Sequence, residues 1–273
     1  MKSLSQYAFD LQRFGLTPAR IASRLVGEAR HAPRILTVTM PKSGTNLLQR
    51  LLVLHPALSR ALLPTLGQRN RERWSDIEKL LAPIGPGRIV SSHFDFDPDL
   101  AATVGDKLGY KILLMVRDPR DAVISDMHYI QSWPGHPLKE RVASMKDDKT
   151  RLLAIINGEH GGRNIRDQIL RFSDWTGHAH TVRFEDTVGA QGGGTDETQL
   201  ETVRGIFAYL GMDVSLEQAK AIAVDARSSK TQTFRTGRIR NWETVYDRDV
   251  KDAFKAVAGD QLIELGYEKD HDW

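Results

Sequence analysis

Short apolar runs rich in β-branched residues alternate with helical patterns along this chain, and no other feature constrains its fold as strongly. The runs with the length and composition of buried strands are 34–40, 88–92, 111–116 and 180–184. Helices are predicted at 44–54, 118–131, 139–157, 163–175 and 248–265, with two more ending near 210 and beginning near 215. Such alternation is typical of an α/β fold with three layers (αβα) and a mainly parallel central sheet.

The length of 273 residues suits a single domain over 1–273, and the chain shows no internal repeat. Apolar residues spaced among polar ones predict an N-terminal helical segment within 1–33, and the charges that interrupt it argue against a signal peptide. No run approaches the ~20 apolar residues that a membrane-spanning helix needs. We therefore expect a cytoplasmic protein without a membrane partner.

The composition narrows the kind of ligand. The formal net charge is only +3, and the basic residues are scattered rather than gathered in one arm or stripe. This distribution disfavours a nucleic-acid partner and suits an anionic small molecule. The chain has no cysteine, which excludes disulfides, thiolate metal sites and a cysteine nucleophile. No metal-ligand cluster is evident in the sequence, and we expect no bound metal.

The loop PKSGTN (41–46) follows the first predicted strand and opens the next helix. Backbone N–H groups at a helix start favour an anion, and Lys42, Ser43, Thr45 and Asn46 can donate hydrogen bonds to one. The alternative is a plain strand-to-helix turn capped by Thr45. The triphosphate-binding pattern G-x-x-x-x-G-K-[ST] is absent, because Lys42 precedes Gly44, so a smaller anion such as a 5′-phosphate suits this loop better.

Two further stretches carry basic residues that can hold an anion. Arg117 ends the third predicted strand, where an arginine can grip a phosphate bidentately, and Ser125 lies about two turns into the following helix. The basic stretch FRTGRIRNW (234–242) has no periodicity and can fold over an anionic ligand. The alternatives are a surface pair between Arg117 and Asp121 and a solvated basic loop.

Taken together, PKSGTN (41–46), RDPRDAVIS (117–125) and RTGRIRNW (235–242) resemble, in order and rough spacing, the motifs of the PAPS-dependent sulfotransferases of cytosolic and bacterial type. VRFEDTV (182–188) resembles the family's RYEDL strand end, and ELGY (264–267) its C-terminal LGY. The resemblance implies a P-loop-like sulfotransferase domain. Such a domain moves a sulfuryl group from 3′-phosphoadenosine 5′-phosphosulfate (PAPS) to a hydroxyl or amine by in-line displacement, with no metal.

The resemblance also implies roles for individual residues. His93, at the end of the second predicted strand, matches the general base, and Lys42 would stabilise the departing 5′-phosphate. The residues implied to hold the 5′ side of PAPS are Lys42, Ser43, Gly44, Thr45 and Asn46. The residues implied to hold the 3′-phosphate and the adenosine are Arg117, Ser125, Phe184, Arg235, Thr236 and Gly237.

The sequence departs from the family pattern near several of these positions. Leu47 stands where the family often has a tryptophan that stacks on adenine, and Phe184 replaces a tyrosine. Thr236 replaces a lysine, and Ser91 stands where many members carry a second lysine near the histidine. The Arg240-Asn241 pair replaces Gly-Asp, so the covering stretch can differ in conformation. The core set of lysine, histidine, arginine and serine is retained.

Other functions stay open at this point. A P-loop-type small-molecule kinase would need a lysine after the glycine and a magnesium-binding acid, and a non-catalytic adenine-nucleotide-binding module would not need both His93 and Lys42. The acceptor cannot be identified from the motifs, and we expect a small molecule. A homodimer is also left open, since Thr244-Val245 partly matches the family's dimer motif.

Overall fold

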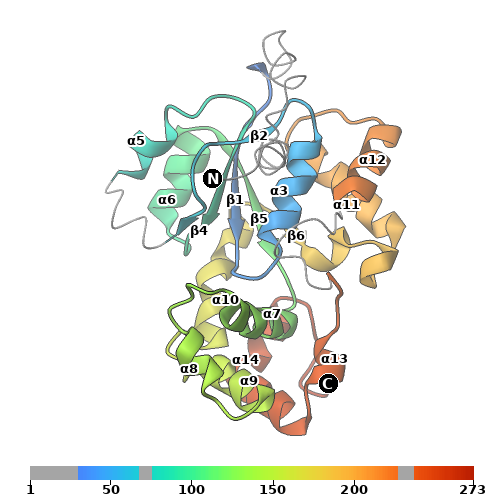
Figure 1. The fold of residues 1–273 in the computed structure, drawn as a ribbon. Helices are drawn as coiled ribbons and strands as arrows, with labels where there is room; N and C mark the ends of the chain where they lie inside the picture. Colours follow the sequence, from blue (N-terminus) through green and yellow to red (C-terminus); the bar gives the residue numbers. More distant parts are fainter. Residues whose placement is uncertain (1–29, 68–75, 227–236) are drawn as a thin grey trace.

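The computed structural model describes residues 30–67, 76–226 and 237–273, and it is built around a six-stranded sheet (Figure 1). The strand order is β2-β4-β1-β5-β6, with β3 beside β4, and every pairing is parallel. The strands are β1 (Arg34–Thr39), β2 (Ser59–Arg60), β3 (Leu66–Gly67), β4 (Arg88–His93), β5 (Tyr110–Val116) and β6 (His180–Arg183). The four predicted strands are confirmed, whereas β2 and β3 were not predicted because two residues carry no periodic signal.

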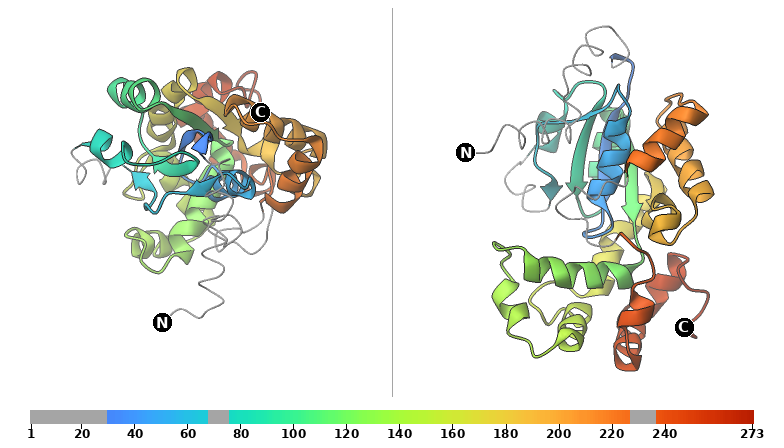
Figure 2. Two further views of the ribbon diagram at one scale, coloured as in Figure 1. Left: turned by 90° about the horizontal axis from the view of Figure 1, so that it is seen from above. Right: turned by 45° about the vertical axis from the view of Figure 1, so that its right-hand side comes forward.

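Helices cover both faces of this sheet, which confirms the three-layer prediction (Figure 2). Side chains alternate along β1, so Ile35 joins one apolar core and Leu36 the other. The helices packed with Ile35 are α3 (Thr45–Leu54), α11 (Asp196–Tyr209) and α12 (Leu216–Ala226). The core that contains Leu36 includes residues of α5 (Ile77–Leu81), α6 (Pro98–Ala102), α7 (Pro119–Ser132), α8 (Lys139–Ala143), α9 (Asp148–Asn157), α10 (Ile165–Ser173), α13 (Trp242–Val245) and α14 (Arg248–Glu264).

Shorter turns complete the described chain. They are a π-helical turn at Thr103–Lys107 and 3₁₀ turns at Asp174–Gly177, Phe184–Thr187 and Ala190–Gly192. No helix in the three described ranges is long and apolar enough to cross a membrane.

The predicted helix over 139–157 was wrong in one respect, because two helices, α8 and α9, occupy it. Asp147 interrupts the helical path with an extended backbone, and its carboxylate accepts a hydrogen bond from the N–H of Thr150, which caps α9. The capping box at Ser215 and Gln218 is confirmed by reciprocal hydrogen bonds of 2.9 and 3.1 Å. Of the predicted segment 1–33, residues 1–29 lie outside the described residues.

The strand register gathers the predicted site residues at one edge of the sheet. Thr39 of β1 pairs with Met115 of β5, and Val116 pairs with Arg183 of β6. The strands therefore end level with one another, and the loops that follow β1, β5 and β6 meet there. Helices α7, α9, α10 and α14 lie beyond this edge, below the sheet in Figure 1. Ligands of open parallel sheets bind at such an edge.

Candidate active site

The loop between β1 and α3 has a conformation that a simple turn does not require. Lys42 has a positive φ of 69°, which is uncommon for a residue with a Cβ, and Gly44 has a φ of 108°. A Cβ on Gly44 would lie 2.6 Å from Cδ2 of Phe184, so only glycine fits here. Gly44 is also the N-cap of α3, without a side-chain cap and with no acidic residue in the first turn. The positive end of α3 is thus left open toward the loop.

Ser43 holds this loop from the inside. It is fully buried, and its hydroxyl lies 2.5 Å from the carbonyl oxygen of Met40 and 2.9 Å from that of Met115. Its N–H donates to the carbonyl of Met40 as well. Both donors of Ser43 are therefore engaged within the protein in this structure, and its predicted contact with an anion stays a prediction.

Lys42 is half-buried, and its ammonium lies 3.7 Å from the centre of the Tyr129 ring. Such a distance is typical of a cation–π contact. Burial lowers the pKa of Lys42 from 10.5 to about 8, with the positive charge of Arg117 adding to the shift and Asp126 opposing it. Lys42 is thus a cation held at the sheet edge without full hydration, a state that a nearby anion stabilises.

The ring of His93 is fixed by Thr39. Its Nδ1 lies 2.7 Å from the carbonyl oxygen of Thr39 and 3.1 Å from the hydroxyl of the same residue. A carbonyl oxygen only accepts, so Nδ1 carries the proton and donates it. The neutral ring therefore keeps its lone pair on Nε2. Burial lowers the pKa of His93, and the charge of Lys42 adds to this, so the neutral form is favoured at pH 7.

The same threonine connects the histidine to the loop. The hydroxyl of Thr39 lies 2.7 Å from the hydroxyl of Thr45, the first residue of α3. A continuous path of hydrogen bonds thus runs from Thr45 through Thr39 to His93. The prediction placed His93 and Thr45 at the same edge, and the structure brings them into one network.

Arg117 is 8% exposed and lies between the loop and the 237–242 segment. Its guanidinium carbon is 4.2 Å from the centre of the Phe184 ring, and its Nη2 donates to the carbonyl of Arg238 at 3.1 Å. Asp121 lies 3.7 Å away, as the alternative interpretation proposed, but both residues are buried rather than on the surface. Within the described residues, Nε of Arg117 and Oδ2 of Asp121 are buried without a hydrogen-bond partner.

The remaining predicted residues lie around this arginine or outside the described residues. Ser125 is half-buried on α7, one turn beyond Asp121 and on the same helix face. Gly237 has a φ of 56°, and two residues later the N–H of Ile239 donates to the carbonyl of Gly192 at 3.0 Å. Asn46 is half-buried in the first turn of α3. Arg235 and Thr236 lie outside the described residues.

Three side chains at the site were not predicted: Thr39, Asp126 and Tyr129. Asp126 and Tyr129 are three residues apart on α7 and so share a helix face. Burial raises the pKa of Asp126, whereas the charges of Lys42, His160 and His136 lower it. In the sequence, Asp126 and Tyr129 are marked only by lying one and four positions after Ser125, on the same predicted helix. In the part of the chain that the structure describes, no group of three or more histidine, aspartate or glutamate side chains is arranged to hold a metal ion.

Comparison with known proteins identifies the family to which the chain belongs. A family model described as a sulfotransferase domain matches residues 32–183, more than half of the chain. The solved structures with this fold include mouse sulfotransferase SULT7A1 complexed with PAP, with 18% identity, a TM-score of 0.64, and coverage of 91% of this chain and 93% of that one. Another is retinol dehydratase in complex with androsterone and the inactive cofactor PAP, with 13% identity, a TM-score of 0.55, and coverage of 84% and 80%. No curated protein sequence matches this chain.

Proposed function

The chain belongs to the sulfotransferase family, and we propose that it transfers a sulfuryl group from PAPS to a hydroxyl or amine of a small-molecule acceptor. The observation that carries this proposal is the pairing of a base and a cation at the sheet edge. The proton on Nδ1 of His93 leaves the lone pair on Nε2, and burial, together with the charge of nearby Lys42, lowers the pKa of the histidine. The fold likeness to two proteins solved with PAP supports the choice of donor.

The described residues fit the 5′ side of PAPS. The open start of α3 and the ammonium of Lys42 offer positive charge to a 5′-phosphosulfate, and Gly44 lets the backbone approach it. Thr45 and Asn46 stand in the first turn of α3, next to this point. We propose that these residues, with Ser43 shaping the loop, hold the reacting end of the donor.

The described residues also fit the 3′-phosphate. Nε of Arg117 is buried without a partner among the described residues, which is a costly arrangement unless a ligand supplies an acceptor. We propose that Arg117 and Ser125 bind the 3′-phosphate. Phe184 would contact the adenosine, and Arg235, Thr236 and Gly237 of the basic stretch would cover it.

In the proposed step, the acceptor oxygen or nitrogen attacks the sulfur in line with the bond to the bridging oxygen. A new bond to sulfur forms, and the old sulfur–oxygen bond breaks with its electron pair on the 5′-phosphate, which releases adenosine 3′,5′-bisphosphate. Nε2 of His93 takes the acceptor proton. Lys42 stabilises the negative charge that grows on the bridging oxygen. Positioning and charge neutralisation supply the catalysis, as in phosphoryl transfer.

Sulfuryl transfer tests this proposal directly. The purified chain is incubated with sulfur-labelled PAPS and a panel of phenols, alcohols and amines, and bisphosphate binding is measured by calorimetry. We expect bisphosphate binding and labelled product from at least one acceptor class. A chain that binds neither PAPS nor the bisphosphate contradicts the proposal, and magnesium-dependent turnover of ATP would favour a kinase.

A cytoplasmic location and a single domain over 1–273 belong to the same proposal. Sedimentation of the same sample tests the homodimer.

A further inference from the structure

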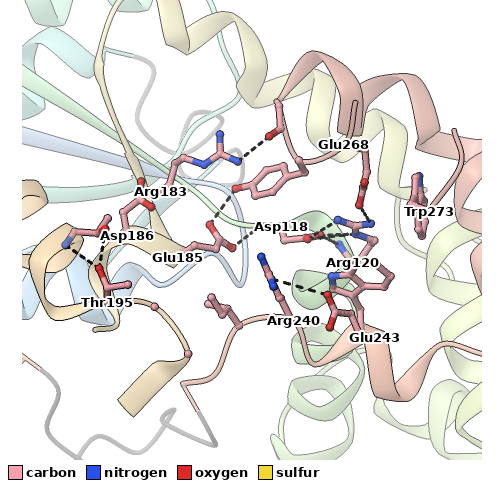
Figure 3. A pocket seen from close by; sticks show the side chains of 17 residues that line it. Asp118, Arg120, Arg183, Glu185, Asp186, Thr195, Arg240, Glu243, Glu268 and Trp273 are labelled. Carbon is pink, nitrogen blue, oxygen red and sulfur yellow. Dashed lines mark hydrogen bonds and ion pairs between the residues drawn. The ribbon is translucent and has the colours of Figure 1, made fainter. Parts of the chain in front are cut away.

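Arg120 lies in the first turn of α7, three residues after Arg117, and it does not face the loop that follows β1. It is 2% exposed, and its guanidinium donates hydrogen bonds to two carboxylates. The carboxylate of Asp118 accepts at 2.8 to 3.2 Å, and Glu268 pairs with Nη1 from the far end of the chain (Figure 3). A buried charge of this kind requires such partners.

Two tryptophans complete the surroundings of Arg120. Its guanidinium carbon lies 3.6 Å from the centre of the Trp242 ring and 4.5 Å from the centre of the Trp273 ring. The two rings are 5.3 Å apart and nearly perpendicular, at 84°. Arg120 therefore joins three segments that are distant in sequence: the start of α7, the end of the 237–242 segment, and the C-terminal segment 265–273.

The 237–242 segment is fixed to the same turn of α7. The N–H of Trp242 donates to Asp121 at 3.1 Å, and the hydroxyl of Tyr246 donates to the carbonyl of Arg120 at 3.0 Å. Earlier in this segment, the carbonyl of Arg238 accepts from Arg117. The segment thus bridges Arg117, the proposed ligand of the 3′-phosphate, and the cluster around Arg120.

A second connection leads from the C-terminal segment to the strand ends. The hydroxyl of Tyr267 donates to Oε2 of Glu185 at 3.2 Å, and Oε1 of Glu185 accepts the N–H of Asp118 at 2.9 Å. Glu185 directly follows Phe184, whose ring lies on Arg117. Since Tyr267 and Glu268 are neighbours, the contacts close a ring through Glu185, Asp118 and Arg120. These residues border a cavity of about 800 Å³ (Figure 3).

From these contacts we propose that the C-terminal segment 265–273 is a positioning element of the donor site. Glu268 and Trp273 act through Arg120 and Trp242 to hold the 237–242 segment and Arg117 in the arrangement that binds the 3′-phosphate. They are positioning residues, because the contacts that carry this proposal join them to Arg120 and Trp242 rather than to the donor. The inference rests on the proposed function, and it concerns affinity for the donor rather than the chemical step.

Three variants of the full chain test it: Glu268→Gln, Trp273→Ala and Trp273→Phe. Exposed Lys269, next to Glu268, supplies the matched control Lys269→Ala. We expect Glu268→Gln and Trp273→Ala to raise the Kd for adenosine 3′,5′-bisphosphate and the KM for PAPS about tenfold, the scale of one charge-assisted hydrogen bond or cation–π contact. At saturating PAPS, kcat should stay within about twofold of the wild type. Trp273→Phe, which keeps a ring over Arg120, should recover most of the affinity.

Hydrogen exchange of the 237–246 amides without ligand gives a second readout, and we expect faster exchange in Glu268→Gln and Trp273→Ala only. If Trp273→Ala does not fold, the isosteric Glu268→Gln alone tests the positioning role. A folded Glu268→Gln that binds the bisphosphate like the wild type, with unchanged exchange, overturns this inference alone. An equal loss of kcat and kcat/KM also overturns it, because the effect would then lie in the chemical step. A wild-type chain that binds no bisphosphate overturns the proposed function and this inference together.

Discussion

Asp126→Asn should change the pH dependence of the enzyme more than its activity at low pH. Asp126 is half-buried on α7 near Lys42, and its charge opposes the fall of the lysine pKa. The amide keeps the shape of the side chain and removes the charge. The pKa of Lys42, already lowered to about 8 by burial and by Arg117, should therefore fall further. Because the proposed step uses the ammonium of Lys42, the alkaline limb of kcat/KM for PAPS should move to lower pH.

The size of the effect can be worked out. The shift of the Lys42 pKa from 10.5 to about 8 corresponds to roughly 3 kcal/mol in favour of the neutral amine. A nearby opposite charge typically changes a pKa by about 1. Without Asp126, the pKa of Lys42, and with it the alkaline limb of kcat/KM, should therefore lie at about 7. At pH ~8 the protonated fraction of Lys42 then falls from about one half to about one tenth, a loss of roughly fivefold in kcat/KM. At pH ~6 both proteins keep the ammonium, and the loss is small.

The assay is initial-rate kinetics from pH 5.5 to 9.5, with PAPS varied and acceptor saturating. Exposed Glu201→Gln on α11 is the matched control for loss of one carboxylate, and it should keep the wild-type profile. Bound PAPS brings phosphate charge to Lys42 and raises its pKa, so the limb of kcat should lie at higher pH than that of kcat/KM in both proteins. The reasoning is refuted if Asp126→Asn lowers kcat/KM by one constant factor across the range, or if the wild-type limb lies near pH 10.

Three other substitutions separate the proposed roles. His93→Ala should lower kcat by about 10²- to 10⁴-fold and leave the bisphosphate Kd within about twofold by calorimetry, and full activity would remove His93 as the base. Arg117→Ala should weaken bisphosphate binding by about 2 kcal/mol or more, because it also leaves Asp121 buried without a cation. Unchanged binding would place the 3′-phosphate elsewhere. Gly44→Ala should lower the unfolding free energy by about 1–3 kcal/mol in urea titrations, because its Cβ would meet Phe184 at 2.6 Å, whereas Gly85→Ala, with open space around it, should change little.

Much of the fold could be predicted from local patterns. Strands such as β1 and β5 are buried on both faces, so they form continuous apolar runs in the sequence. The helix that follows β5, α7, begins with the capping residue Asp118. Once the strands are parallel, their carboxyl ends share an edge, and this alone brings His93, Lys42 and Arg117 together. The short strands β2 and β3 form through their pairing with β4, and no local sequence pattern predicts this pairing.

The finer parts of the site depend on tertiary contacts that a motif does not encode. Ser43 sits within an anion-binding motif, yet its hydroxyl is turned to the carbonyls of Met40 and Met115. Asp126 follows Ser125 in sequence, and only the packing of α7 shows that it influences the pKa of Lys42. Trp273 lies over Arg120, 153 positions away in sequence. Such pairs form through the fold and leave no periodic signal.

The described site combines several locally unfavourable features, and one bound ligand would stabilise all of them. Lys42 has a positive φ and a lowered pKa, α3 begins without a side-chain cap, and Nε of Arg117 is buried without a partner among the described residues. Each feature alone is unfavourable, and sequences that fold well avoid such conflicts except at functional sites. An anion at the loop would stabilise the ammonium and the helix start, and a second anion would satisfy the arginine. A donor with phosphate at both its 5′ and 3′ positions supplies the two anions in one molecule, whereas a simple phosphate supplies one.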